Sequence, residues 1–241
     1  AGDVTPEEVR SQAETHYGPI PANPDVAMRV RPQEPPQIAE RRVVYEDERV
    51  ANPYVARAYH APAREPGDQR QAAALTMLAE ILGGSGQTSV LGRQLQVEEE
   101  RALFSSAWYS ATSYDPASFN LVNVPVPGVS LEEAEADLDR VIAQFLEDGI
   151  DPAQFERIKF QIEAAQIYEE DNVQGLARSY GVALTSGLTL DDVLTWPDVL
   201  ASVTIDEVMM EARRLFTETR AVTGYLMQPA TDDAPAEEVS Q

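Results

Sequence analysis

The sequence predicts an α+β fold, with a mostly antiparallel sheet covered by helices on one face. Three observations support this prediction. Two pairs of strand-like segments flank two helical segments, which gives the order β-β-α-α-β-β. Longer helical patterns follow and predict a helical bundle. A final apolar segment, Ala221–Met227, has the length and composition of a last strand.

A helix is expected near the start of the chain. Thr5 can accept the N-cap hydrogen bond, Pro6 fits the first helical position, and Glu8 completes a capping box. We expect the helix to end near Tyr17, before a glycine and a proline. Six prolines lie between residues 19 and 38, so this stretch is expected to be an extended linker.

The first two strands are expected at Arg41–Tyr45 and Tyr54–Tyr59, with a turn at Asn52-Pro53 between them. The second pair is expected at Ala102–Ser113 and Ser118–Val126. Each segment alternates or is rich in aromatic and β-branched residues, as strands are.

Two helices lie between these strand pairs. The first has apolar residues at helical spacing, namely Leu75, Leu78, Ala79 and Leu82. Gly83-Gly84 is expected to end it, because glycine accepts the left-handed conformation without strain. Thr88 or Ser89 can cap the second helix, whose inner face has Val90, Leu91 and Leu95.

Four helical patterns follow the second strand pair. A capping box at Ser130 predicts a helix to about Glu147. Asp151-Pro152 opens a long helix to about Ala183, with a bend or break at Asn172 and Gly175 as the alternative. Its expected buried stripe is Phe155, Ile158, Ile162, Ala165 and Ile167. Shorter helices are expected from Thr189 to Leu200 and from Thr204 to Thr217.

Composition limits the classes of function. The 241 residues have a formal net charge of −23, which repels nucleic acid and anionic lipid. No apolar run approaches the roughly 18 residues that span a bilayer. Cysteine is absent, so disulfides and thiolate zinc sites are excluded. We therefore expect no partnership with nucleic acid or membrane.

The residues suggest neither a catalytic nor a metal site. The two histidines, His16 and His60, lie far apart in the sequence, and neither belongs to an H-x-x-E-H zinc motif. No G-x-S-x-G nucleophile motif is present. Arg93 and Arg101 flank an acidic run and could bind a peptide carboxylate or carbonyl; surface ion pairs are the alternative. The aromatic residues near them, Trp108, Tyr109 and Tyr114, are expected to pack in the core or sheet.

The order of four segments resembles the pitrilysin/insulinase-type zinc peptidases, and more narrowly the second half of their two-domain bacterial form. The segments are GDVTPEEVRSQAETHYGPIP, LAEILGGSGQTSVLGRQLQVEEERALFSS, FERIKFQIEAAQIYEEDNVQGLARSYGVALTSG and WPDVLASVTIDEVMMEARRLF. The resemblance implies four parts of the chain. Residues 1–20 would be the last helix of a truncated N-terminal module of the catalytic type. Residues 21–38 would be a linker, 39–228 the C-terminal α+β module, and 229–241 a disordered acidic tail.

The resemblance also implies a function. The missing N-terminal module would bind zinc and hydrolyse peptides, whereas this chain would bind no cofactor and would wall the chamber that encloses peptide substrates. Some family members place an Arg seven residues before a Tyr to contact substrate. The matching positions here are Val97 and Phe104, so that pair is absent and Arg101 is a loose substitute. Expected substrate contacts are therefore Arg93, Arg101 and Phe104.

The expected partners are the N-terminal module in cis, peptides and a second chain of the same family. The acidic charge suggests a preference for basic peptides. The alternative function is a structural or partner-subunit protein on the same scaffold, without peptidase activity. Some bacterial relatives are exported, so the periplasm is expected, with the cytoplasm as the alternative.

Overall fold

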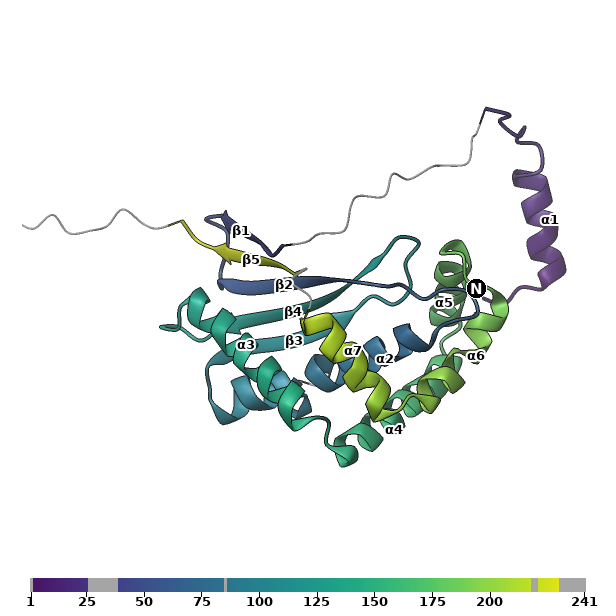
Figure 1. The fold of residues 1–241 in the computed structure, drawn as a ribbon. Helices are drawn as coiled ribbons and strands as arrows, with labels where there is room; N and C mark the ends of the chain where they lie inside the picture. The colour runs from purple at the N-terminus through teal and green to yellow at the C-terminus, as the bar shows by residue number, and fades with distance from the viewer. Residues whose placement is uncertain (1, 26–38, 85, 218–220, 230–241) are drawn as a thin grey trace, which may run out of the picture.

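The computed structural model describes residues 2–25, 39–84, 86–217 and 221–229, without the side chains of residues 169, 170 and 217. Five strands form one sheet: β1 (Arg41–Glu46), β2 (Tyr54–Ala61), β3 (Ala102–Tyr109), β4 (Ala117–Pro125) and β5 (Ala221–Met227). The α-helices are α1 (Pro6–His16), α2 (Arg70–Ala79), α3 (Leu131–Asp148), α4 (Pro152–Glu170), α5 (Val173–Thr185), α6 (Leu190–Ser202) and α7 (Ile205–Thr217). Figure 1 shows the helices on one side of the sheet, with α1 standing apart from it.

The sheet has the order β1-β5-β2-β4-β3. Only β1 and β5 pair in parallel, and the other neighbouring strands are antiparallel. The predicted order of elements and the mostly antiparallel sheet are thus confirmed. The last strand of the chain lies between the first two, which the sequence pattern did not indicate.

Strand alternation separates a buried face from an open face. Along β2 and β4 the odd-numbered residues are buried and the even-numbered residues mostly are not. Val55, Tyr59, Phe119 and Leu121 therefore face the helices, where they join the core residues of α2, α3 and α7. This core holds the covered face of the sheet onto the helices.

The glycine pair after α2 has a different role from the expected one. The helix continues as a π-helix, η1 (Glu80–Gly84), and neither glycine has a positive φ. Instead, a Cβ on Gly83 would overlap the backbone nitrogen of Ala107. Gly83 thus lets the helix end pack directly against the backbone of β3.

The second predicted helix is also mainly a π-helix, η3 (Gly92–Glu98), and it follows the short 3₁₀ helix η2 (Gly86–Thr88). The helical run that leads into η3 begins at Val90, directly after Ser89, whose hydroxyl accepts a hydrogen bond from Gly92 N at 3.2 Å as a capping residue does. The expected inner-face residues Leu91 and Leu95 are fully buried.

Capping boxes place three helix starts as predicted. The pairs Thr5–Glu8, Ser130–Glu133 and Thr189–Asp192 each show the reciprocal side-chain to backbone hydrogen bonds. These local bonds satisfy amide groups that the first helical turn leaves without partners.

The expected long helix is two helices, so the alternative of a break is correct. α4 ends at Glu170, and the Asn172 side chain caps α5 by accepting a hydrogen bond from Gly175 N at 2.9 Å. The predicted stripe is wrong in its second half. Phe155 and Ile158 are buried, whereas Ala165 and Ile167 are exposed.

Most of the predicted linker, residues 26–38, and residues 230–241 of the predicted tail lie outside the described residues. The proposed division of the chain therefore stays a prediction. None of the described helices is both long and apolar enough to cross a membrane.

Candidate functional site

The face of the sheet opposite the helices is left uncovered by the part of the chain that the structure describes (Figure 1). Register places Phe104 and Trp108 of β3 on this open face, beside Val124 and Asn120 of β4. Phe104 is 49% exposed and Trp108 46% exposed. Trp108 therefore lies on the sheet but not in the core, whereas Tyr109 packs as predicted, stacked against the core residue Phe119 with ring centroids 6.4 Å apart.

The open face has few charges despite the acidity of the chain. Among the described strand residues, alternation places only two of the basic or acidic side chains on it, Arg41 of β1 and His60 of β2. Most other residues there are aliphatic, aromatic or hydroxyl-bearing. An extended polypeptide could therefore contact this face with little desolvation of charge.

The three expected substrate contacts do not lie together. Arg93, on η3, forms an exposed ion pair with Glu98 at 3.5 Å. Arg101 contacts α3, which packs against the covered face of the sheet, whereas Phe104 belongs to the open face. Their role as substrate contacts stays a prediction, and both arginines have ion-pair partners within the chain.

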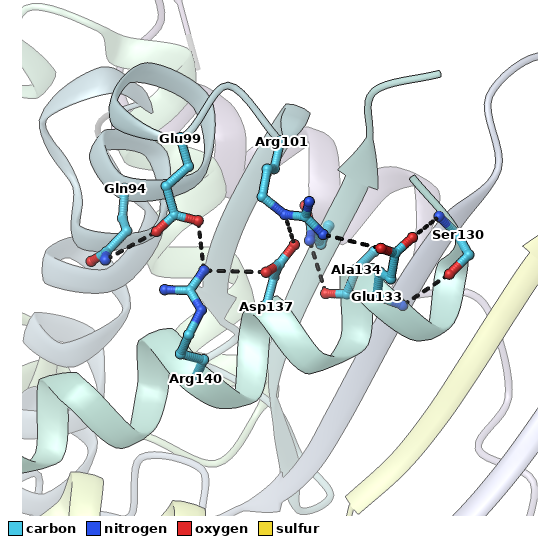
Figure 2. A network of polar contacts seen from close by, with 9 residues as sticks. Gln94, Glu99, Arg101, Ser130, Glu133, Ala134, Asp137 and Arg140 are labelled. Atoms are coloured by element: carbon cyan, nitrogen blue, oxygen red, sulfur yellow. Dashed lines mark hydrogen bonds and ion pairs between the residues drawn. The ribbon is translucent and has the colours of Figure 1, made fainter. Parts of the chain in front are cut away.

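Figure 2 shows the network that holds Arg101. Its Nε donates to Asp137 Oδ2 at 2.7 Å, and its Nη2 lies 3.8 Å from Glu133 Oε1. The hydrogen bond to Asp137 raises the pKa of Arg101. Arg140 bridges Asp137 to Glu99, at 3.2 Å and 2.6 Å. The network thus fixes the turn between η3 and β3 onto α3.

A cavity of about 680 Å³ lies beside the open face, at the end of β2. Its walls come from the segment after β2, the β3–β4 connection, α2 and α7, with lining residues that include Arg64, Tyr114, Glu211 and Arg214. A hollow of about 440 Å³ on the open face adjoins it, because both are lined by His60, Ser113 and Pro116. The sequence prediction missed this cavity, since its residues come from segments far apart in the chain.

One signal of the cavity was present in the sequence. Glu211 lies on α7 among residues that form the core, between Val208 and Leu215 at helical spacing. A carboxylate within an apolar stripe needs a special environment, because burial of an unpaired charge is unfavourable.

The described residues contain no group of three or more histidine or acidic side chains that could hold a metal ion. His16 lies on α1 and His60 at the end of β2. The geometry thus provides an open sheet face and an adjoining charged cavity, which are features of a binding surface.

Comparisons with known proteins identify a family and a shared fold. The family model described as "Peptidase M16 inactive domain" matches residues 1–162. A protease from Helicobacter pylori has a similar structure, with a TM-score of 0.85, 20% sequence identity and coverage of 95% of this chain and 53% of that chain. No curated protein matches the sequence.

Two further solved structures share the fold. The peptidase M16 inactive domain from Pseudomonas fluorescens has a TM-score of 0.71 and 14% identity, over 95% of this chain and 52% of that chain. The periplasmic protease PqqL from Escherichia coli has a TM-score of 0.73 and 16% identity, over 95% of this chain and 26% of that chain. The chain spans about half the length of the Helicobacter pylori and Pseudomonas fluorescens proteins and about a quarter of the length of PqqL. By its family model, supported by the shared fold, the chain belongs to the peptidase M16 inactive domain family.

Proposed function

We propose that this chain is the non-catalytic C-terminal half of a zinc metalloendopeptidase. It would form one wall of a chamber and help to bind and enclose peptide substrates. A preceding N-terminal module would hold the zinc and carry out hydrolysis, with a zinc-polarised water as nucleophile. This chain would contribute binding surface and no ligand to the metal.

The uncovered face of the sheet carries the proposal. A sheet in a soluble domain usually buries at least one face, and a second face that is broadly apolar marks a surface that contacts something else. Phe104 and Trp108 are half-exposed there and offer aromatic contact area to a peptide. Such a surface, facing the metal site of another module, would enclose a peptide between them.

Helix α1 supports a preceding module in cis. All of its residues are exposed, including Val9, and Tyr17 and Ile20 just beyond its end are exposed as well. Val9, Ala13 and Tyr17 follow at intervals of four, so they share one side of the helix. The apolar side of α1 is therefore available to pack against a preceding module.

Among the three residues first expected to contact substrate, Phe104 fits this proposal best, since it lies on the open face of β3, the strand that also carries Trp108. Arg93 and Arg101 already have carboxylate partners within the chain, which would compete with a peptide for them. We further propose the periplasm as the compartment, supported by the periplasmic relative PqqL.

Tryptophan fluorescence tests the binding role. The chain has two tryptophans, and a Trp196→Phe variant leaves only Trp108, on the open face. Titration with a short unstructured peptide should then change the emission of Trp108. The matched Trp108→Phe variant retains Trp196, which lies under the Arg64 guanidinium at 3.9 Å, and its emission should change much less. Equal responses in both variants, or no response in either, would contradict the open face as a peptide surface.

The encoding gene tests the catalytic part. About 200–230 codons before Ala1 correspond to one more module of this size. An H-x-x-E-H motif with a later glutamate in that stretch is expected. A preceding module without the motif would instead favour the structural or partner-subunit alternative.

A further inference from the structure

We propose that the cavity beside the open face binds the cationic side chain of a lysine or arginine in the enclosed peptide, with Oε1 of Glu211 as its acceptor. The inference rests on the proposed function, because it assigns a substrate class to the peptide surface. The net charge of −23 alone would attract basic peptides without a defined site. The inference instead assigns their recognition to one cavity and one acceptor atom.

Glu211 is a buried carboxylate with an unused oxygen. The residue is only 6% exposed, and it lines the cavity from α7. Gln71 Nε2 donates to its Oε2 at 2.9 Å, and Arg214 Nη1 lies 3.9 Å from the same atom. No described residue donates a hydrogen bond to Oε1. A buried carboxylate gains most from a donor at each oxygen, so Oε1 is suited to receive one from a ligand.

Oε1 can be reached from the cavity. Among the described residues, Asn123 Oδ1 is the one side-chain polar atom that is both sealed from solvent and without a hydrogen-bond partner. Glu211 Oε1 also lacks a partner, so it must retain contact with the open space. The cavity volume of about 680 Å³ is in the range of pockets that hold small ligands, so a long side chain fits with room for water.

The basic residues of the wall do not occupy Oε1. Arg64 has its guanidinium over the Trp196 ring at 3.9 Å, and its Nε donates to Gln69 Oε1 at 2.7 Å. Its Nη2 donates to the Asp192 carbonyl at 3.0 Å, so Arg64 is held by α6 and the loop before α2. The side chain of Arg214 is 62% exposed, and among the described residues its one ion-pair contact is the long one to Oε2. It can turn into solvent when a ligand arrives.

The other charges favour a cation. The lining includes two further acidic residues, Glu65 and Asp115, besides Glu211. The cavity shares His60, Ser113 and Pro116 with the hollow on the open face. A peptide that crosses the open face at His60 can therefore insert one side chain into the cavity while its backbone stays on the sheet.

Two matched peptides and two opposed variants test the site. The peptides have one lysine or one norleucine at the same position and are otherwise uncharged; the measurement is titration calorimetry with the full chain at low salt. We expect the lysine peptide to bind about tenfold more tightly, as for a charge-assisted hydrogen bond. Glu211→Gln keeps the shape and should abolish that preference.

Arg214→Gln separates a cation site from an anion site. Because Arg214 competes for the same carboxylate, its removal should tighten lysine-peptide binding by about two- to fivefold. A peptide with glutamate at the test position should bind more weakly than the norleucine peptide. Tighter glutamate binding, or weaker lysine binding in Arg214→Gln, would overturn the inference.

Controls keep the outcomes distinct. Asp206→Asn removes an exposed charge from the same helix and should leave the lysine preference unchanged. If the lysine and norleucine peptides bind equally well to the wild-type chain, the cavity inference is overturned but the proposed function is not, since the open face still binds peptide. This comparison uses only the wild-type chain, so it is valid even if Glu211→Gln does not fold. Absence of binding by every peptide overturns the proposed function together with the inference.

Discussion

Helices α2 and α5 are both regular, yet they differ in what they bury. α2 lies under the sheet and has seven buried residues, Ala72, Ala73, Ala74, Leu75, Met77, Leu78 and Ala79. α5 lies in the helical arm formed by α4, α5 and α6, and Ala183 is its one buried residue among those described. Large apolar side chains stay exposed in this arm, including Phe160, Ile167, Tyr168, Leu184 and Leu194.

The difference separates helix formation from core formation. Asn172 and Thr189 cap helices of the arm through local hydrogen bonds, so these helices start where the sequence dictates. Burial instead requires a surface to pack against, and α4 contributes to the buried core from its first turns, through Phe155 and Ile158. The arm should therefore add little to the free energy of unfolding of this chain, whereas the residues under the sheet should dominate it.

The largest expected effect comes from the same truncation in the two regions. Leu78→Ala removes a fully buried side chain from α2 and should lower the free energy of unfolding by about 3 kcal/mol. Leu194→Ala in the arm, where the side chain is 58% exposed, should change it by less than about 0.5 kcal/mol. Urea denaturation measures both. Similar losses of unfolding free energy in the two variants would contradict the proposed difference in packing between α2 and the arm.

Two glycines should respond to alanine with opposite sign. On Gly83 the new methyl would overlap the backbone of β3, so about 1–3 kcal/mol of stability should be lost as the helix end moves away. On Gly181 in α5 a Cβ meets nothing within 4 Å, and alanine should stabilise the helix by up to about 1 kcal/mol. Thermal unfolding of the two variants shows whether each substitution raises or lowers the stability. A stabilising Gly83→Ala would contradict the close packing.

A smaller, pH-dependent effect is expected where α7 joins α2. The hydrogen bonds from Arg70, then those from Thr204, lower the pKa of Glu207 from 4.5 to about 2. A lowered carboxyl pKa stabilises the folded state above the unfolded value of 4.5, and this contribution is lost as pH falls from 4.5 towards 2.

Glu207→Gln should therefore cost about 1 kcal/mol at pH 7, after allowance for solvent screening of a half-exposed pair, and less at pH 4. Asp191→Asn, in the first turn of α6, has no arginine bonded to it among the described residues and is the control from the arm. Urea unfolding at the two pH values checks both variants. A cost for Glu207→Gln that does not shrink at the lower pH would rule out the ion pair as its source.

Sequence patterns predicted the elements better than their arrangement. Capping boxes and alternation depend on neighbouring residues, so Thr5, Ser130 and Thr189 marked helix starts correctly. The exposed end of α4 was predicted as buried because Ile167 was included in the stripe of Phe155, although twelve residues place it about 120° around the helix from Phe155. Periodicity shows which side of a helix is apolar but not where its packing partner ends.

The site was less predictable than the fold. Arg93 and Arg101 were candidate contacts because they flank acidic residues, and the same proximity gives them partners within the chain. Glu211 acquires its role only when α2, α7 and the β3–β4 connection meet around it. No local pattern specifies which segments of the chain will surround a given carboxylate.

The position of β5 has a consequence for synthesis of the protein. Because β5 lies between β1 and β2, the sheet cannot be completed until Met227 has left the ribosome. Until then β1 has no strand beside it, and the β5 side of β2 stays unpaired, although β2, β3 and β4 can already associate. Pairing across such long sequence separation is slow, and unpaired strand edges favour misassociation. Nascent chains of this module should thus depend on protection of those edges until β5 has been synthesised.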